Sequence, residues 1–190
     1  MATLLGPGAT VAPGPTATPA GAALIVDSGA QPFTSVDTVS FSGTLRTRVY
    51  SADPGNPFGA TGLTFTFLLT NNGPDALERL VTINYGGYLT DVGVNLALVP
   101  GALPIAVDRS ANGKVVGWDY TGGPGIGPGG NSTLLVIHTD ATQFVPATNS
   151  VINGSVAVVP SFGPLPIPEP ASMGLAGIAL LGLVARRRSN

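Results

Sequence analysis

One histidine and no cysteine are available for chemistry in this chain of 190 residues. His138 directly follows the apolar run Leu134–Ile137, so it is expected at the end of a strand. A single histidine cannot build a conventional transition-metal site unless carboxylates complete it. A serine–histidine–aspartate arrangement would also have to use His138, but the chain contains no Gly-x-Ser-x-Gly motif. We therefore interpret His138 as a polar strand-end residue, not as a ligand or a catalytic base.

The acidic residues do not form a pattern that predicts a catalytic pair. The chain has only two glutamates, Glu78 and Glu169. Asp75 and Glu78 flank one turn, and Asp53 and Asn56 flank another. Ca²⁺ needs about six to eight oxygen ligands, and no Asp-x-Asp-x-Asp-Gly loop supplies them. We predict that these residues cap turns, that the chain is not an enzyme, and that it has no catalytic, cofactor-binding or metal site. Ca²⁺ binding is left open.

Trp118 and Tyr120 are the aromatic residues with the clearest alternative role. They share a strand face with Val116, so they lie together either in the core or on an exposed surface. An exposed plane that also held Tyr85 or Tyr88 could stack on sugar rings. That arrangement would indicate a carbohydrate-binding or weakly hydrolytic extracellular module. We favour burial in the core, which is the commoner position of such residues.

The last residues of the chain combine three features in a fixed order. A Pro-Glu-Pro triplet at 168–170 is followed by an uncharged, mostly apolar run from Ala171 to Ala185. The run ends in the basic residues Arg186, Arg187 and Arg188. At 1.5 Å per helical residue the run spans about 22 Å, short of the roughly 30 Å of hydrocarbon in a bilayer. The pattern predicts a single short transmembrane helix that inserts transiently, with its basic end in the cytoplasm.

This pattern resembles the PEP-CTERM sorting signal of exported bacterial proteins. The residues that carry the start of the resemblance are Pro168, Glu169, Pro170, Ala171 and Ser172. The resemblance implies recognition by an exosortase-type membrane transpeptidase, which cuts near the triplet and releases or transfers the preceding domain. It also implies an exported protein that crosses the inner membrane and ends at the cell surface or in the extracellular matrix. An ordinary membrane anchor or a buried helix with a basic end is the alternative.

Composition predicts an all-β domain ahead of this signal. Charged residues make up 9% of the chain, while glycine and proline number 27 and 18, which is typical of an exported β protein. Without cysteine there are no disulfides, so stability depends on the core. Removing Glu169 and the three arginines leaves nine acids and five scattered bases, a net charge of −4. This distribution contains no basic patch that would bind nucleic acid.

Alternating side chains indicate about eight strands and no helix before the signal. The clearest alternation covers residues 36–50 and 63–69, and Gly43 predicts a bulge in the first of these strands. Further strands are expected at 80–85, 92–99, 105–109, 114–120, 133–139 and 151–159. The dipeptide Asn112-Gly113 predicts a hairpin turn. Together these features predict a β-sandwich of the Ig-like or jelly-roll type.

Strand parity also predicts which side chains form the core. The expected core residues are Val39, Phe41, Leu45, Val49, Leu63, Phe65, Phe67, Val81, Ile83, Val116 and Trp118. The segment 63–77, LTFTFLLTNNGPDAL, is similar to a strand and turn of Ig-like conserved-repeat modules in bacterial surface proteins. This similarity implies the same sandwich class.

The expected organisation has four parts. Residues 1–22 form a disordered leader or linker, 23–159 the β-sandwich, 160–167 a stiff proline-rich spacer, and 168–190 the sorting signal. We expect a structural protein of the cell surface or matrix that has no cofactor. Its expected partners are an exosortase and the membrane, with exopolysaccharide as a further candidate.

Residues 1–22 contain no positive n-region and no apolar stretch long enough for a secretory signal. Either the true start lies upstream, or the chain is an unexported copy. We favour the first alternative and predict that the upstream reading frame encodes Lys or Arg followed by about 7 to 15 apolar residues. Sequencing the genomic DNA upstream of Met1 checks this, and an in-frame stop codon immediately before Met1 would contradict it.

Overall fold

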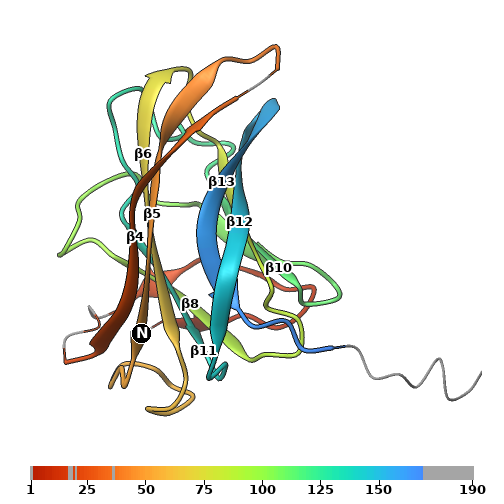
Figure 1. The fold of residues 1–190 in the computed structure, drawn as a ribbon. Coiled ribbons are helices and arrows are strands. Elements are labelled where there is room, and N and C mark those ends of the chain that lie inside the picture. Colours follow the sequence, from red (N-terminus) through yellow and green to blue (C-terminus); the bar gives the residue numbers. More distant parts are fainter. Residues whose placement is uncertain (1, 17–18, 20, 36, 169–190) are drawn as a thin grey trace, which may run out of the picture.

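The computed structural model describes residues 2–16, 19, 21–35 and 37–168. In this part of the chain every regular element is a β-strand, and the strands form two mainly antiparallel sheets that face each other (Figure 1). The predicted all-β sandwich class is therefore confirmed. Among the described residues, no helix is long and apolar enough to cross a bilayer. The predicted transmembrane helix, residues 171–185, lies outside the described residues.

The larger sheet has the strand order β1-β8-β11-β6-β5-β4, and β3 also pairs with β8. Its strands are β1 (Thr3–Leu4), β3 (Gly14–Pro15), β4 (Ala23–Thr34), β5 (Phe41–Ser51), β6 (Thr64–Pro74), β8 (Thr90–Asn95) and β11 (Leu134–Thr139). Alternation along β5 gives the sheet its two faces. Phe41, Leu45 and Val49 are buried in the core, while Arg46 and Arg48 point to the outer face.

The smaller sheet has the strand order β13-β12-β7-β10-β9-β2. Its strands are β2 (Thr10–Val11), β7 (Arg79–Ile83), β9 (Ala106–Arg109), β10 (Val115–Asp119), β12 (Phe144–Asn153) and β13 (Ser155–Pro164). The predicted Asn112-Gly113 turn joins β9 and β10, which pair antiparallel. Gly113 has a φ of 71°, in the left-handed region that glycine adopts without strain.

The bulge predicted at Gly43 is also present. The pairing register of β5 with β6 shifts between Ser42 and Gly43. A side chain at this position would collide with the carbonyl oxygen of Thr70 and with the ring of Phe33. Glycine is therefore required here because the neighbouring strands approach the backbone closely.

The core between the sheets contains eight of the predicted residues. Those eight are Phe41, Leu45, Val49, Leu63, Phe65, Phe67, Val116 and Trp118. The prediction was wrong for β7, where Leu80 and Thr82 are buried in place of Val81 and Ile83, and Val39 is only partly buried. β7 has apolar residues at both parities, so its sequence does not specify the inward face. Thr82 can be buried because its hydroxyl donates to the carbonyl oxygen of Val116 at 3.1 Å.

The strand predicted at 151–159 is instead a hairpin. β12 and β13 pair along their whole length around Gly154, which has a φ of 63°. The dipeptide Asn153-Gly154 is a hairpin signal of the same kind as Asn112-Gly113. Residues 160–164 belong to β13, so the predicted spacer at 160–167 was wrong for these residues, and only 165–167 lie outside a strand. β13 tolerates Pro160 and Pro164 because it lies at the edge of its sheet.

The N-terminal residues 2–16 are part of the fold, which corrects the expectation of a disordered leader at 1–22 for this part of it. β1 and β3 extend the larger sheet, and β2 extends the smaller one. Leu5 is fully buried, and its backbone N–H donates to the carbonyl oxygen of Thr90 at 2.9 Å. The segment carries no charge, so this pairing leaves no ionised side chain without water.

We predict that Leu5→Ala in the full chain lowers the free energy of unfolding by about 2 to 5 kcal/mol, because it opens a cavity in the core. The matched control is Leu4→Ala, since Leu4 is 63% exposed, and this change should alter stability by less than about 0.5 kcal/mol. Urea unfolding measures both variants. Equal stabilities would show that the N-terminal segment does not support the core.

Candidate functional site

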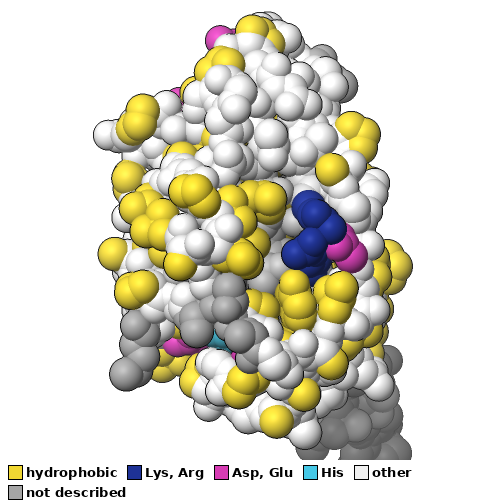
Figure 2. Space-filling model, turned by 90° about the vertical axis from the view of Figure 1, so that its left-hand side faces the viewer, with side chains coloured by type: hydrophobic (Ala, Val, Ile, Leu, Met, Phe, Trp, Pro, Cys, Tyr) yellow, Lys and Arg dark blue, Asp and Glu magenta, His cyan; other side chains and the backbone are white. Residues whose placement is uncertain are grey.

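Ionisable side chains gather on or beside the outer face of the larger sheet, which is turned away from the core. They are Asp27, Arg46, Arg48, Asp53, Asp91 and His138. Figure 2 shows the arginine pair with its acidic partner, and a histidine beside acidic side chains lower on the same face. The pairing register explains this grouping. His138 pairs with Asp91 and Thr64, and Arg48 pairs with Asp27.

His138 lies between two buried carboxylates. Its Nδ1 atom is 3.2 Å from Oδ1 of Asp91, and its Nε2 atom is 3.5 Å from Oδ2 of Asp53. Asp53 also accepts hydrogen bonds from the hydroxyl of Thr64 at 2.7 Å and from the backbone N–H of Gly55 at 2.9 Å. The histidine is 1% exposed, and the two aspartates are 2% and 6% exposed.

This arrangement gives His138 two carboxylate partners inside the protein. Each ring nitrogen faces a carboxylate, so both nitrogens have a partner within the protein. Buried carboxylates need hydrogen-bond donors or a counter-charge, and the imidazole lies where it can supply both. In the described residues no group of three or more His, Cys, Asp or Glu side chains is arranged to hold a metal ion. The predicted position of His138 near a strand end agrees with its place in β11, which ends at Thr139.

Arg46, Arg48 and Asp27 form the second cluster. Arg46 donates from Nε to Oδ1 of Asp27 at 2.9 Å and from Nη2 to Oδ2 at 2.6 Å. Arg48 donates from Nε to Oδ2 of the same carboxylate at 2.8 Å. The hydrogen bond from Arg46 is the largest cause that lowers the pKa of Asp27, and burial opposes it. Two cations thus share one anion, which leaves one positive charge on this cluster.

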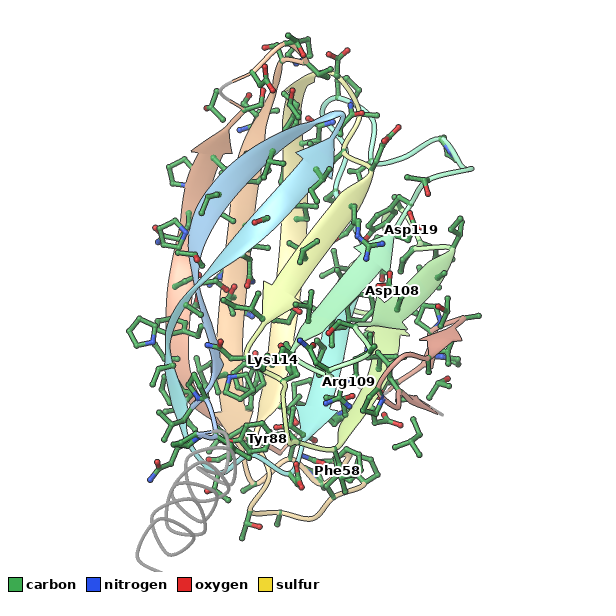
Figure 3. All side chains as sticks on the ribbon, turned by 90° about the vertical axis from the view of Figure 1, so that its right-hand side faces the viewer. Phe58, Tyr88, Asp108, Arg109, Lys114 and Asp119 are labelled. Carbon is green, nitrogen blue, oxygen red and sulfur yellow. The ribbon has the colours of Figure 1, made fainter. Side chains whose placement is uncertain are left out.

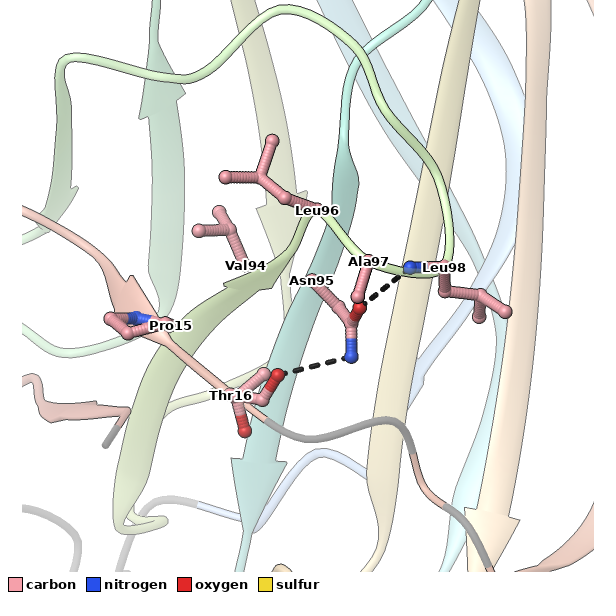
Figure 4. A pocket seen from close by; sticks show the side chains of 7 residues that line it. All are labelled: Pro15, Thr16, Val94, Asn95, Leu96, Ala97 and Leu98. Carbon is pink, nitrogen blue, oxygen red and sulfur yellow. Dashed lines mark hydrogen bonds between the residues drawn. The ribbon is translucent and has the colours of Figure 1, made fainter.

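A loop of residues 96–99 crosses the outer face and leaves a hollow on each side of it. Asn95 holds the loop, since its side-chain N–H donates to the carbonyl oxygen of Thr16 at 3.0 Å and its Oδ1 accepts the N–H of Leu98 at 2.9 Å (Figure 4). The hollow drawn in Figure 4 measures about 530 Å³ and lies against Pro15 and Val94. The other measures about 240 Å³ and lies between Leu98 and the arginine pair.

The C-terminal segment leaves the sandwich beside the loop that contains Tyr88. The backbone N–H of Leu165 donates to the carbonyl oxygen of Gln143 at 3.0 Å. The carbonyl oxygen of Leu165 accepts a hydrogen bond from the hydroxyl of Tyr88 at 2.6 Å. Ile167 packs over Gly87, where a β-carbon would lie 2.9 Å from its Cδ1 atom. Tyr88 and Lys114 lie toward this end of the molecule, far from Asp119 (Figure 3). Of the predicted sorting residues, Pro168 is described and exposed.

The remaining predicted site residues lie outside the described residues. They are Glu169, Pro170, Ala171, Ser172, Arg186, Arg187 and Arg188. Residues 166–188 match the family model of the PEP-CTERM protein-sorting motif. The chain carries a PEP-CTERM sorting motif. Such a motif marks an exported protein that passes through the membrane and is processed by an exosortase.

The PEP-CTERM match covers the triplet, the apolar run and the arginine cluster that the sequence analysis identified. No curated protein and no solved structure matches the chain. The similarity to Ig-like conserved-repeat modules therefore stays a prediction.

The aromatic residues ahead of the PEP-CTERM motif do not form an exposed platform. Trp118 is fully buried, Tyr120 is 2% exposed, and Tyr85 is fully buried. Burial raises the pKa of both Tyr85 and Tyr120, as expected for phenols held away from water. The sugar-stacking arrangement considered for Trp118, Tyr120 and Tyr85 is therefore absent.

Sequence reasoning missed both ionisable clusters, although one left a signal. Arg46 and Arg48 are two residues apart in a strand, so alternation places them on the same face. Their partner Asp27 lies on another strand, and no local spacing connects the two. The aspartates beside His138 are likewise separated from it by many residues, so only the strand register could have brought them together.

We predict that His138→Leu lowers the free energy of unfolding by about 3 to 5 kcal/mol, because it leaves buried carboxylates without their partner. Adding Asp91→Asn should restore part of this loss, since a neutral amide needs no counter-charge. Urea unfolding of the single and double variants gives the coupling energy, which should exceed about 1 kcal/mol. Asp108→Asn on the other sheet is the control, and its effect should add to that of His138→Leu. If the effects of His138→Leu and Asp91→Asn on the free energy of unfolding are also additive, the imidazole does not stabilise the Asp91 carboxylate.

Proposed function

We propose that this chain is an exported structural protein of the cell surface or extracellular matrix, delivered there by exosortase processing. The observation that carries the proposal is the position of the PEP-CTERM motif. β13 ends at Pro164, and the matched motif begins at residue 166. Every strand of the described chain lies between Thr3 and Pro164, so a cut near the triplet would keep all of them in one product.

The segment before the triplet suits recognition by a membrane enzyme. Residues 165–168 are exposed, and they follow β13 without forming a further strand. Pro164, Pro166 and Pro168 alternate with Leu165 and Ile167, and each proline lacks a backbone donor and disfavours helix at the preceding residue. The chain is therefore kept in extended form as it leaves the sandwich, which supports presentation of Glu169 to an enzyme at the end of the domain.

A non-enzymatic role is supported by the chemistry of the described residues. The only histidine has both ring nitrogens directed at carboxylates, and its side chain is almost completely buried. Trp118, Tyr85 and Tyr120 are buried in the core and do not form an exposed platform. Exopolysaccharide, the further candidate partner, would have to bind the sandwich through other surfaces.

We predict that replacing Pro168, Glu169 and Pro170 by alanine leaves the sandwich folded, while uncut protein accumulates in the membrane fraction of the native host. The triplet lies beyond the last strand, so the urea unfolding midpoint should not change. Mass spectrometry of the C-terminus of the mature protein measures the processing. The control is the unaltered chain in a host that lacks the exosortase, which should also remain uncut. A mature wild-type protein that still ends at Asn190 would refute removal of the tail.

A further inference from the structure

We propose that the hollow between the arginine pair and the 96–99 loop binds a small carboxylate ligand with an apolar body. This inference goes beyond export and processing, and it does not depend on the exosortase. The hollow lies on the outer face of the larger sheet, next to the arginine pair in Figure 2. It concerns the sandwich itself, for which the sorting motif gives no activity.

The arginine pair beside the hollow has donors that Asp27 does not engage. Asp27 engages Nε of both arginines and Nη2 of Arg46. Three further donor atoms, Nη1 of Arg46 and both Nη atoms of Arg48, make no hydrogen bond within the described part of the chain. Both side chains line the hollow and are partly exposed, at 41% and 32%. A guanidinium that one carboxylate already orients has less side-chain entropy to lose when it binds a second.

The local charge beside the hollow is positive. The processed domain carries a net charge of −4, so an anion is attracted only where cations outnumber acids locally. Arg46, Arg48 and Asp27 together have a charge of +1. This charge is constant over a wide pH range, because the pKa of Asp27 is lowered from its ordinary value of 3.8. Any stability that this ion pair contributes is present above pH 3.8 and is lost only as the pH falls toward the lowered pKa.

The walls of the hollow are mostly apolar. Leu68 and Leu134 come from the sheet, Leu98 and Val99 from the loop, and the volume of about 240 Å³ suits a ligand the size of one ring. Leu98 is 53% exposed, which leaves apolar surface for a ligand to cover. An inorganic anion would bind the guanidinium groups but leave the apolar walls exposed to water. A carboxylate attached to an apolar group would satisfy both features.

The loop that forms the outer wall is already in place. Asn95 fixes the start of the loop through its two hydrogen bonds to Thr16 and Leu98. A ligand would therefore not have to order this wall, which favours binding by a small molecule. The hollow on the other side of the loop lacks this combination, because none of the described residues that line it carries a charged side chain.

The test uses the full chain, isotope-labelled in a non-ionic detergent, and follows the arginine Nε–Hε signals by NMR. Benzoate should shift the signals of Arg46 and Arg48 saturably, with a dissociation constant on the order of millimolar, as expected for so small a ligand. The signal of Arg79, which pairs with Asp108 on the other sheet, should not move. Benzyl alcohol, which lacks the charge, and inorganic phosphate, which lacks the apolar ring, should each bind at least about tenfold more weakly.

Variants separate the two parts of the site. Arg48→Gln should weaken benzoate binding about tenfold, and Leu98→Ser should weaken it several-fold by removing apolar contact. Arg79→Gln is the matched control and should leave the dissociation constant unchanged. The proposal is overturned if benzoate produces no saturable shift or if benzyl alcohol binds as tightly. Phosphate binding as tight as that of benzoate would also overturn it, because the apolar walls would then have no part in recognition.

Discussion

One buried guanidinium holds together the end of the sandwich from which the chain leaves. Arg109 is 4% exposed and is surrounded by carbonyl and hydroxyl oxygens rather than by a carboxylate. Its acceptors are the carbonyl oxygens of Leu5, Tyr85, Tyr88 and Gly113 and the hydroxyl of Thr90, at 2.7 to 3.0 Å. Burial lowers the pKa of Arg109 while the charge of Asp140 opposes this effect, and arginine remains protonated in proteins. Its five fixed donors thus join the N-terminal segment, β8, the 85–88 loop and the β9–β10 hairpin (Figure 3).

This guanidinium is also connected to the start of the sorting motif. The carbonyl oxygen of Tyr88 accepts from Arg109, and the hydroxyl of Tyr88 donates to Leu165. The backbone of the departing segment is therefore attached to a loop that the buried cation fixes. Ser161 of β13 shares a hydrogen bond of 2.8 Å with Thr47 of β5. The last strand is thus bound to both sheets before the motif begins.

The sequence predicts those parts of the fold in which only one pattern of burial is possible. β5 alternates large apolar and polar residues, so the inward positions of Phe41, Leu45 and Val49 follow directly. β7 does not alternate, and Leu5 has an equally apolar neighbour, so their burial depends on pairing with distant strands. The ionisable clusters have the same origin. Strand register places His138 beside Asp91, and no spacing within either segment contains that information.

The short connection between the last strand and the triplet constrains how processing can occur. Four residues separate Pro164 from Glu169, so their Cα atoms are five residue steps apart and lie at most about 18 Å from each other in an extended chain. If the apolar run is held in a bilayer while the triplet is cut, the folded sandwich must lie against the membrane or the enzyme. The end that faces them is then the one that carries Tyr88 and the Arg109 network. A loosely packed end would expose its buried carbonyl groups at that surface, whereas the guanidinium keeps them satisfied within the protein.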